Sequence, residues 1–495
     1  MSVPVGAVVM VIVLAAAGAL PVLALVGFRL VAVPLVPLGG SVLAAVATAG
    51  SVAVGGTLEG WFVALALGAT TVVVALWLLR PSRRPHRRNP ETPSVLDRLT
   101  GLVALIGMTV AAGWSLIALR TPSVGFDART IWMLHGRWYE QGHAVSLAAL
   151  RNTALPFAHA GYPPLVGGTV ALSWVITGNH TDRFGVVVVA LLNACAAMAA
   201  AWMLVDLGRR AGRWVADARG PDASATVGLG VGTVPCVVGA GSAVLLVLVA
   251  FGVAGPFATN GYADMLWATS AVGAVGFGLV LSGRRTDLGA AVVLLAVAGL
   301  TKDEGYVTSM AIVALVALRG AVSSPVGETG RWWRPMAAGA AGVIGLGLWP
   351  LVTRVLHAAP NAAAPGPRDG NDVSRLHDSV VSMAAHLHIL LLAAPVALVA
   401  MIVLGRARRA MGFGSDAWTW AALLAGLGFI LVVYVTGPAN IELWLLTSTH
   451  RTTFYGALLA WWVVGIWAVI GSAHGASQRG VRRRGRPTGT LPRSA

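Results

Sequence analysis

The stretch DLGAAVVLLAVAGLTKDEGYVTSMAIVALVAL, residues 287–318, places a charged tip between two apolar runs. The tip, Lys302-Asp303-Glu304, contains the only lysine among the 495 residues. As a helix, residues 287–301 rise only about 22 Å, whereas the hydrocarbon core of a bilayer is about 30 Å thick. Lys302 and Glu304 are therefore expected in the outer leaflet, where ionisable groups are costly and mark functional sites. The alternative is a polar hairpin tip in which the two side chains only neutralise each other.

The composition of the chain defines its class. Hydrophobic residues make up 57% of the sequence and charged residues 11%, with a mean hydropathy of +0.77. A soluble globular domain carries about 25% charged residues. We therefore expect an all-α polytopic membrane protein. The net charge of +16 does not indicate nucleic-acid binding, because the arginines fall between apolar runs, as topology signals do.

Apolar windows of roughly spanning length predict about 13 transmembrane helices. The windows are 5–27, 31–54, 61–79, 99–119, 184–206, 228–252, 264–282, 287–301, 305–319, 336–356, 384–404, 416–437 and 453–473. Cys195 and Cys236 both lie in apolar segments, so neither a disulfide framework nor a metal cluster is indicated.

Arginine clusters predict the orientation of these windows. The clusters lie at 80–88, 209–210, 284–285, 331–334, 406–409 and 482–484. All of them face the cytoplasm if the N-terminus is external, the C-terminus is internal and the apolar stretch 162–178 does not cross. This stretch is then an interfacial or re-entrant part of the first external loop, 120–183. The threading places the unusual polar residues on the external face. The sequence is rich in alanine, valine, glycine and arginine, which indicates a high-GC bacterium, so we expect a bacterial plasma-membrane protein.

The same threading divides the chain into four parts. Residues 1–80 form extra N-terminal helices, and 81–98 form a basic cytoplasmic loop. Residues 99–455 form a membrane core with the external loop 120–183. Residues 456–495 contain the last helix and a basic cytoplasmic tail.

Asp127 lies near the start of the first external loop, eight residues beyond the 99–119 window. Trp132, His135 and Tyr139 follow at helical spacing, which predicts an interfacial amphipathic helix with its aromatic face toward lipid. A carboxylate at the lipid boundary can act as general base toward a hydroxyl whose partner is dissolved in the bilayer. Alternatively, Asp127 caps this helix or pairs with Arg129.

Three further motifs are expected at the external ends of helices. Gly161-Tyr162-Pro163-Pro164-Leu165 fixes an extended start and holds Tyr162 at the interface. Gly261-Tyr262-Ala263-Asp264 begins the next helix, where Asp264 can also be an ordinary N-cap. Arg451, near the start of the last helix, opposes the macrodipole and requires an anionic neighbour. A phosphate or Glu442 would serve equally well.

The order and shared external placement of these motifs resemble the membrane-embedded glycosyltransferases of the C-type (GT-C) fold. The similarity is to the bacterial branch related to protein O-mannosyltransferases, lipid A aminoarabinose transferases and lipopolysaccharide core sugar transferases. It covers roughly residues 100–455. Ala128 stands where many relatives have a second acidic residue, and Tyr162 replaces the histidine of a common His-Pro-Pro pattern.

The resemblance implies a donor sugar on polyprenyl phosphate and an envelope glycan, lipid or protein acceptor, with transfer by inversion. It implies that Asp127 is the catalytic base and that Lys302 and Arg451 hold the phosphate. It implies no cofactor and no metal ligand, and it leaves a divalent-metal requirement open. The predicted substrate-binding residues are Arg129, Trp132, His135, Tyr162, Tyr262, Asp264, Lys302, Glu304, Glu442 and Arg451.

Two other functions compete with this interpretation. A carrier or flippase for a lipid-linked or anionic substrate would use the Lys302 tip as a coupling-ion or proton site. Such a carrier is expected to have a site near mid-membrane between repeated halves, whereas the charges here cluster at external helix ends. A non-catalytic scaffold of an envelope-assembly complex is the third possibility.

Overall fold

A computed structural model gives the fold of this chain. It describes residues 1–79, 95–119, 124–218, 232–281, 284–323, 347–359, 368–414, 416–437 and 440–484. Within these ranges the chain is helical and contains no strand. The all-α polytopic class predicted from the sequence is therefore confirmed.

The helices follow the apolar windows closely. The N-terminal half contains α1 (Val3–Val26), α2 (Ala32–Val54), α3 (Leu58–Leu78), α4 (Val95–Ala118), η1 (Ala128–Met133), α5 (Leu134–Glu140), α6 (His143–Leu150), η2 (Pro156–Ala158), α7 (Leu165–Thr177) and α8 (Asp182–Asp217). The rest contains α9 (Thr233–Ala254), η4 (Gly255–Ala258), α10 (Asp264–Val275), η5 (Gly276–Val280), α11 (Arg285–Gly299), α12 (Asp303–Ser323), α14 (Leu348–Val355), α15 (Asp372–His386), α16 (His388–Ala410), α17 (Asp416–Thr436), α18 (Ile441–Thr452) and α19 (Phe454–Arg484).

Ten helices in the described ranges are long and apolar enough to cross a membrane. They coincide with ten of the predicted windows. The windows 264–282 and 287–301 correspond to shorter helices, α10 with η5 and α11. The window 336–356 lies largely outside the described residues. The chain is thus a multi-pass membrane protein, and the count of thirteen remains a prediction.

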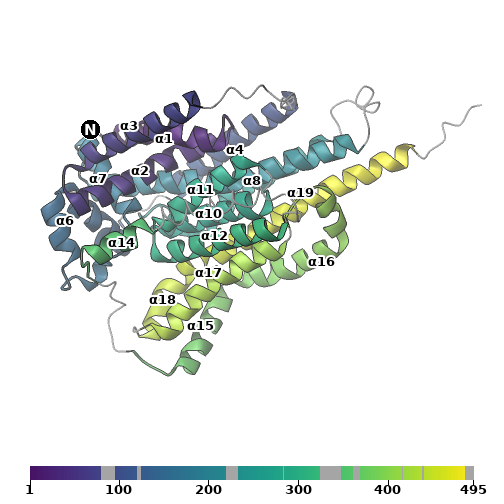
Figure 1. The fold of residues 1–495 in the computed structure, drawn as a ribbon. Helices are drawn as coiled ribbons and strands as arrows, with labels where there is room; N and C mark the ends of the chain where they lie inside the picture. The colour runs from purple at the N-terminus through teal and green to yellow at the C-terminus, as the bar shows by residue number, and fades with distance from the viewer. Residues whose placement is uncertain are drawn as a thin grey trace, which may run out of the picture.

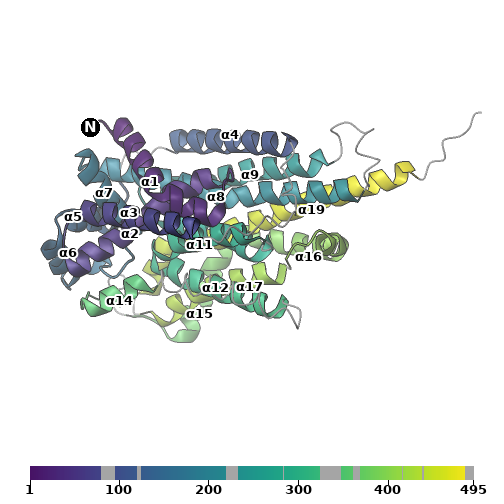
Figure 2. The ribbon, with the colours of Figure 1, turned by 45° about the horizontal axis from the view of Figure 1, so that its top comes forward.

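The two ends of the helix bundle differ in character. α5, α6, α7, α14 and α15 gather at one end, here called the loop end (Figures 1 and 2). The opposite end is called the arginine end, because arginines from three helices converge there on the carbonyls around the end of η5. Arg210 donates to Leu281 O and Arg319 to Leu279 O, while Arg408 donates to Gly414 O. Turning the molecule keeps the same two ends apart (Figure 2).

A buried ion network fixes the arginine end. Arg29 donates to Asp287 at 2.8 Å and also pairs with Asp206, and Arg210 pairs with the same Asp287. These contacts tie the α1–α2 turn to α8 and α11. The clusters 80–88 and 331–334 lie outside the described residues.

Close helix packing in the bundle depends on small residues. Gly208 of α8 and Gly239 of α9 face each other so closely that a Cβ on either would collide with a backbone carbonyl of the other helix. Membrane helices associate through such small residues because lipid offers them no hydrophobic driving force.

The segment predicted not to cross the membrane forms α7, which has only thirteen residues. Its length is about 20 Å, shorter than a hydrocarbon core of about 30 Å. Most of its residues are buried, and it packs against α2, α5 and α8. Its interfacial or re-entrant placement remains a prediction.

One sequence-based prediction about the first loop is wrong. Trp132, His135 and Tyr139 do not face lipid, because at most 2% of each residue is exposed. They face the protein, where Gly167 of α7 leaves room for His135 and Tyr139. Helical spacing identified the shared face but not its partner, because an aromatic stripe suits lipid and protein equally well.

Candidate functional site

A cavity of about 570 Å³ opens at the loop end of the bundle. Its apolar wall comes from α17 and α18, with Phe429, Ile430, Val433, Leu443 and Trp444. Its polar side comes from the first loop and from the starts of α10 and α12, far away in the sequence. One space therefore has both a long apolar surface and a cluster of charges.

The charges form an alternating chain of three carboxylates and two cations. Asp127 pairs with Arg451, and Arg451 Nη1 lies 3.6 Å from Asp264 Oδ2. Lys302 Nζ then contacts Asp264 Oδ1 at 2.9 Å and Glu304 Oε1 at 3.1 Å. The cations are well shielded from solvent, so their interactions with anions are strong.

This arrangement settles three alternatives that the sequence left open. Asp127 makes no side-chain cap, and its ion-pair partner is Arg451 rather than Arg129. Asp264 makes no cap either, and it pairs with both cations. The anionic neighbours of Arg451 are these two aspartates, while Glu442 is exposed.

Backbone contacts position Lys302 and Glu304. Thr301 N bonds Ala298 O at the end of α11, and α12 begins at Asp303, so only three residues separate the two helices. Gly305 packs so closely on Ala298 and Trp267 that a Cβ there would collide with the Ala298 carbonyl. The glycine that follows the tip Lys302-Asp303-Glu304 is thus required by packing.

Asp127 is held by the turn that precedes α10. Gly125 N bonds Asn260 O at 3.1 Å, and Asp127 N lies 3.4 Å from the Tyr262 hydroxyl. The Arg451 guanidinium lies 4.8 Å from the centre of the Tyr262 ring, a cation–π contact. Burial raises the pKa of Tyr262, so its phenol stays protonated.

The loop 156–164 brings an aromatic wall to the cavity. Tyr162 stacks on Trp132 at 5.5 Å and on His159 at 4.6 Å between ring centres. Three hydrogen bonds hold this loop: His135 Nε2 with Ala158 O at 2.7 Å, Trp349 Nε1 to Gly161 O at 2.9 Å, and Leu165 N to Leu300 O at 2.9 Å. The last bond joins the loop to the segment just before Lys302.

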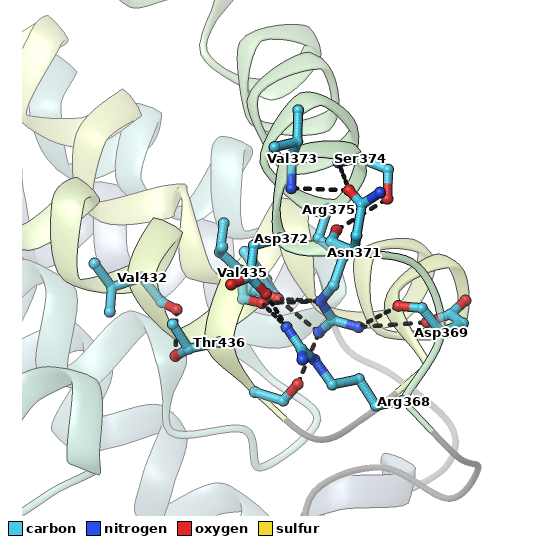
Figure 3. A network of polar contacts seen from close by, with 12 residues as sticks. Arg368, Asp369, Asn371, Asp372, Val373, Ser374, Arg375, Val432, Val435 and Thr436 are labelled. Atoms are coloured by element: carbon cyan, nitrogen blue, oxygen red, sulfur yellow. Dashed lines mark hydrogen bonds and ion pairs between the residues drawn. The ribbon is translucent and has the colours of Figure 1, made fainter.

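A polar clamp holds the corner between α17 and α18. Arg375 of α15 is fully buried and donates to the carbonyls of Tyr434, Val435 and Gly437 at the end of α17 (Figure 3). Asp369 accepts from Arg375 and from Ile441 N, the first residue of α18. The clamp thus sets the relative position of the two helices that carry the apolar wall.

Most of the predicted site residues come together here. Asp127, Trp132, Tyr162, Asp264, Lys302, Glu304 and Arg451 line the cavity. Tyr262 lies behind Arg451 and contacts it. Like Tyr262, three other predicted residues do not line the cavity: Arg129 and Glu442 are exposed, and His135 is buried behind the loop that it holds.

Sequence reasoning missed His159 and Tyr434. His159 lines the cavity and precedes the Tyr-Pro-Pro motif by three residues, a spacing that could have indicated it. The Tyr434 hydroxyl bonds Ser448 and Thr452 at 2.8 Å each, across the α17–α18 corner. Tyr434 offered no sequence signal, because it ends an ordinary apolar helix.

The described residues contain no group of three or more His, Cys, Asp or Glu side chains placed to hold a metal ion. The chain matches no family model, no curated protein and no solved structure. The chemistry of the site therefore has to be argued from its own geometry.

Proposed function

We propose that this chain is a glycosyltransferase that uses a polyprenyl-phosphate sugar as donor at the outer face of a bacterial plasma membrane. The observation that carries the proposal is a single cavity that joins Asp127, two shielded cations and a long apolar wall. A polyprenyl-phosphate sugar has three matching parts: an apolar chain, an anionic phosphate and a polar sugar. The GT-C resemblance of the sequence motifs points to the same donor class.

The proposed donor places its prenyl chain along α17 and α18, beside residues such as Phe429, Val433 and Trp444. Its phosphate then reaches Arg451 and Lys302. Arg451 offers a planar fork that matches two phosphate oxygens, and Lys302 adds a point charge.

Donor binding has a consequence for Asp127. Arg451 contacts both Asp127 and Asp264 through Nη1, so a phosphate that binds this nitrogen displaces a carboxylate. Asp127 is the more exposed of the two, with 24% of its side chain accessible against 5% for Asp264. We therefore infer that the donor phosphate displaces the Asp127 carboxylate from Arg451. This carboxylate becomes available as a base only when the donor phosphate occupies Arg451.

The proposed reaction follows from these positions. Asp127 takes the proton of an acceptor hydroxyl, whose oxygen bonds to the anomeric carbon as the bond from that carbon to the phosphate oxygen breaks. The polyprenyl phosphate leaves with the electron pair and gains one negative charge, which Arg451 and Lys302 stabilise in a shielded site. The configuration at the anomeric carbon inverts. The acceptor is an envelope glycan, lipid or protein that bears the hydroxyl.

The test is transfer in proteoliposomes that contain the purified chain. Polyprenyl phosphates bearing radiolabelled mannose, glucose, galactose or arabinose are supplied with a membrane extract as the source of acceptors. We expect one donor to label an acceptor and to release polyprenyl phosphate in equal amount. Movement of the intact labelled donor between leaflets, with no transfer from any donor, would favour the carrier. If neither sugar transfer nor movement of the donor is observed, the scaffold function is favoured.

A further inference from the structure

Two buried polar atoms in the cavity lack a hydrogen-bond partner within the part of the chain that the structure describes. They are His159 Nδ1 and Glu304 Oε2. Both residues line the cavity, and Glu304 uses only its other carboxylate oxygen, Oε1, to contact Lys302. Buried polar groups without partners are rare in native proteins, so a pair of them in one cavity points to a ligand.

The backbone holds His159 in an unusual conformation. Its φ of 47° and ψ of 57° lie in the left-handed region, which residues other than glycine seldom adopt. The neighbouring carbonyls of Ala158 and Gly161 are bonded to His135 and Trp349, and Tyr162 N bonds His159 O at 2.8 Å. Strained conformations that the surroundings impose in this way cluster at functional sites.

The two free atoms complement each other chemically. A carboxylate oxygen only accepts hydrogen bonds, whereas a neutral imidazole offers one donor and one acceptor nitrogen. Burial, together with the charge of Lys302, lowers the pKa of His159, so the ring is neutral at neutral pH. The two side chains line the same cavity. Beside them, His159, Tyr162 and Trp132 form a ladder of stacked rings.

We propose that His159 and Glu304 bind hydroxyl groups of the donor's sugar ring, with Glu304 as acceptor and His159 as a specificity-determining partner. A hydroxyl both donates and accepts, so the hydroxyls of one sugar ring suit an acceptor oxygen and an imidazole that line the same cavity. The flat C–H face of a pyranose or furanose suits an aromatic wall. This assignment rests on the proposed donor class, and it adds His159 to the site.

The experiment compares two ligands on the purified full-length protein in detergent. Binding constants are measured for bare polyprenyl phosphate and for the same lipid bearing mannose, glucose, galactose or arabinose. The ratio of the two binding constants gives the contribution of the sugar to the affinity. The variants are Glu304→Gln and His159→Phe. The phenylalanine keeps a flat ring that can stack on Tyr162. His377→Phe on the exposed face of α15 is the matched control.

We expect the preferred sugar to tighten binding to the wild type and to the control, and each cavity variant to reduce that gain about 10-fold. Binding of bare polyprenyl phosphate should change much less. A gain that survives both variants would overturn the assignment, even if transfer is observed. If both variants abolish the gain in binding but no donor supports sugar transfer, the sugar site stands and the proposed transferase activity is overturned. No sugar-dependent gain in the wild type would overturn the sugar site directly.

If His159→Phe unfolds, Glu304→Gln decides alone, because it keeps the shape of the side chain and a contact to Lys302. Donors that lack one ring hydroxyl provide the second measurement. Removal of the contacted hydroxyl should weaken binding to the wild type but have little further effect in Glu304→Gln. Equal losses in both proteins would contradict a direct contact.

Discussion

Arg451 joins the two halves of the proposed site, because it contacts Asp127 and Asp264 and lies over the rings of Tyr262 and Phe257. A single side chain thus couples the proposed base to the proposed phosphate position. This contact could not be predicted from the sequence, because Asp127 and Arg451 are 324 residues apart. The sequence did indicate an anionic neighbour for Arg451, but the reason given for it was wrong. Arg451 does not begin the last helix; it lies in the last turn of α18, where a cation suits the macrodipole.

Arg451→Lys tests the planar fork. The variant keeps the positive charge but loses the geometry that matches two phosphate oxygens. We expect the dissociation constant for polyprenyl phosphate to rise about 10-fold, which is a loss of about 1.4 kcal/mol. The matched control is Arg137→Lys, in the half-exposed pair with Asp182. Equal affinities for wild type and Arg451→Lys would show that phosphate binding does not depend on the planar fork.

The next scale is that of the elements, where two segments hold the cavity walls. The loop 156–164 depends on His135, and the α17–α18 corner depends on Arg375. Neither role was predictable from the sequence. A histidine on an aromatic stripe suits an interface, and an arginine in a short amphipathic helix is usually exposed. Only the fold shows that both side chains point inward and bond to carbonyls.

His135 makes the loop sensitive to acid. Burial lowers its pKa from 6.5 to about 4, although the bond to Ala158 O opposes the shift. Between pH 6.5 and 4, His135 is therefore protonated in the unfolded chain but neutral in the folded chain. Stability is full above pH 6.5 and falls as the pH drops toward 4, by about 3 kcal/mol in all.

The measurement is the unfolding temperature of the detergent-solubilised protein between pH 7.5 and 4.5. His135→Phe keeps an aromatic ring and should lower stability at pH 7.5 while flattening the acid-dependent loss. The exposed His377→Phe should follow the wild-type curve. A His135→Phe curve parallel to that of the wild type would show that another group causes the acid sensitivity.

Arg375→Met tests the polar clamp. The variant keeps much of the side-chain volume but leaves the carbonyls of Tyr434, Val435 and Gly437 without this donor. Each lost hydrogen bond to a charged group costs about 1.5–3 kcal/mol. We expect faster amide hydrogen exchange in α18 and at the end of α17, with weaker donor binding. Arg406→Met, at an exposed position of α16, is the control, and identical exchange in the two variants would contradict the clamp.

At the scale of the whole molecule, most of the helical architecture could be predicted from the sequence. Ten predicted windows became helices of spanning length, because lipid imposes long apolar runs that are visible without any structure. The short helices α7, α10 and α11 were harder to classify, since length alone does not distinguish a short span from a buried segment. The cavity was predictable only as a set of polar helix ends, because its shape depends on tertiary packing.

The orientation of the bundle gives a separate prediction. His180 lies near the loop end and Ala218 at the far end of the 36-residue helix α8. In a chain that lacks Cys195 and Cys236, His180→Cys should react with an impermeant thiol reagent added to intact cells. Ala218→Cys should react only after permeabilisation. The reverse pattern would place the cavity on the cytoplasmic face and overturn the arginine-based threading.

The most direct measurement is sugar transfer by Asp127→Asn in proteoliposomes, with donor binding measured on the same preparation. The amide keeps the shape of the side chain and removes the base, so we predict a fall in transfer of about 10²–10⁴-fold. Donor binding should persist or tighten, because Arg451 is released from its carboxylate partner. Asp182→Asn, outside the cavity, should transfer normally. Transfer by Asp127→Asn at the wild-type rate would contradict the proposed role of Asp127 and the mechanism built on it.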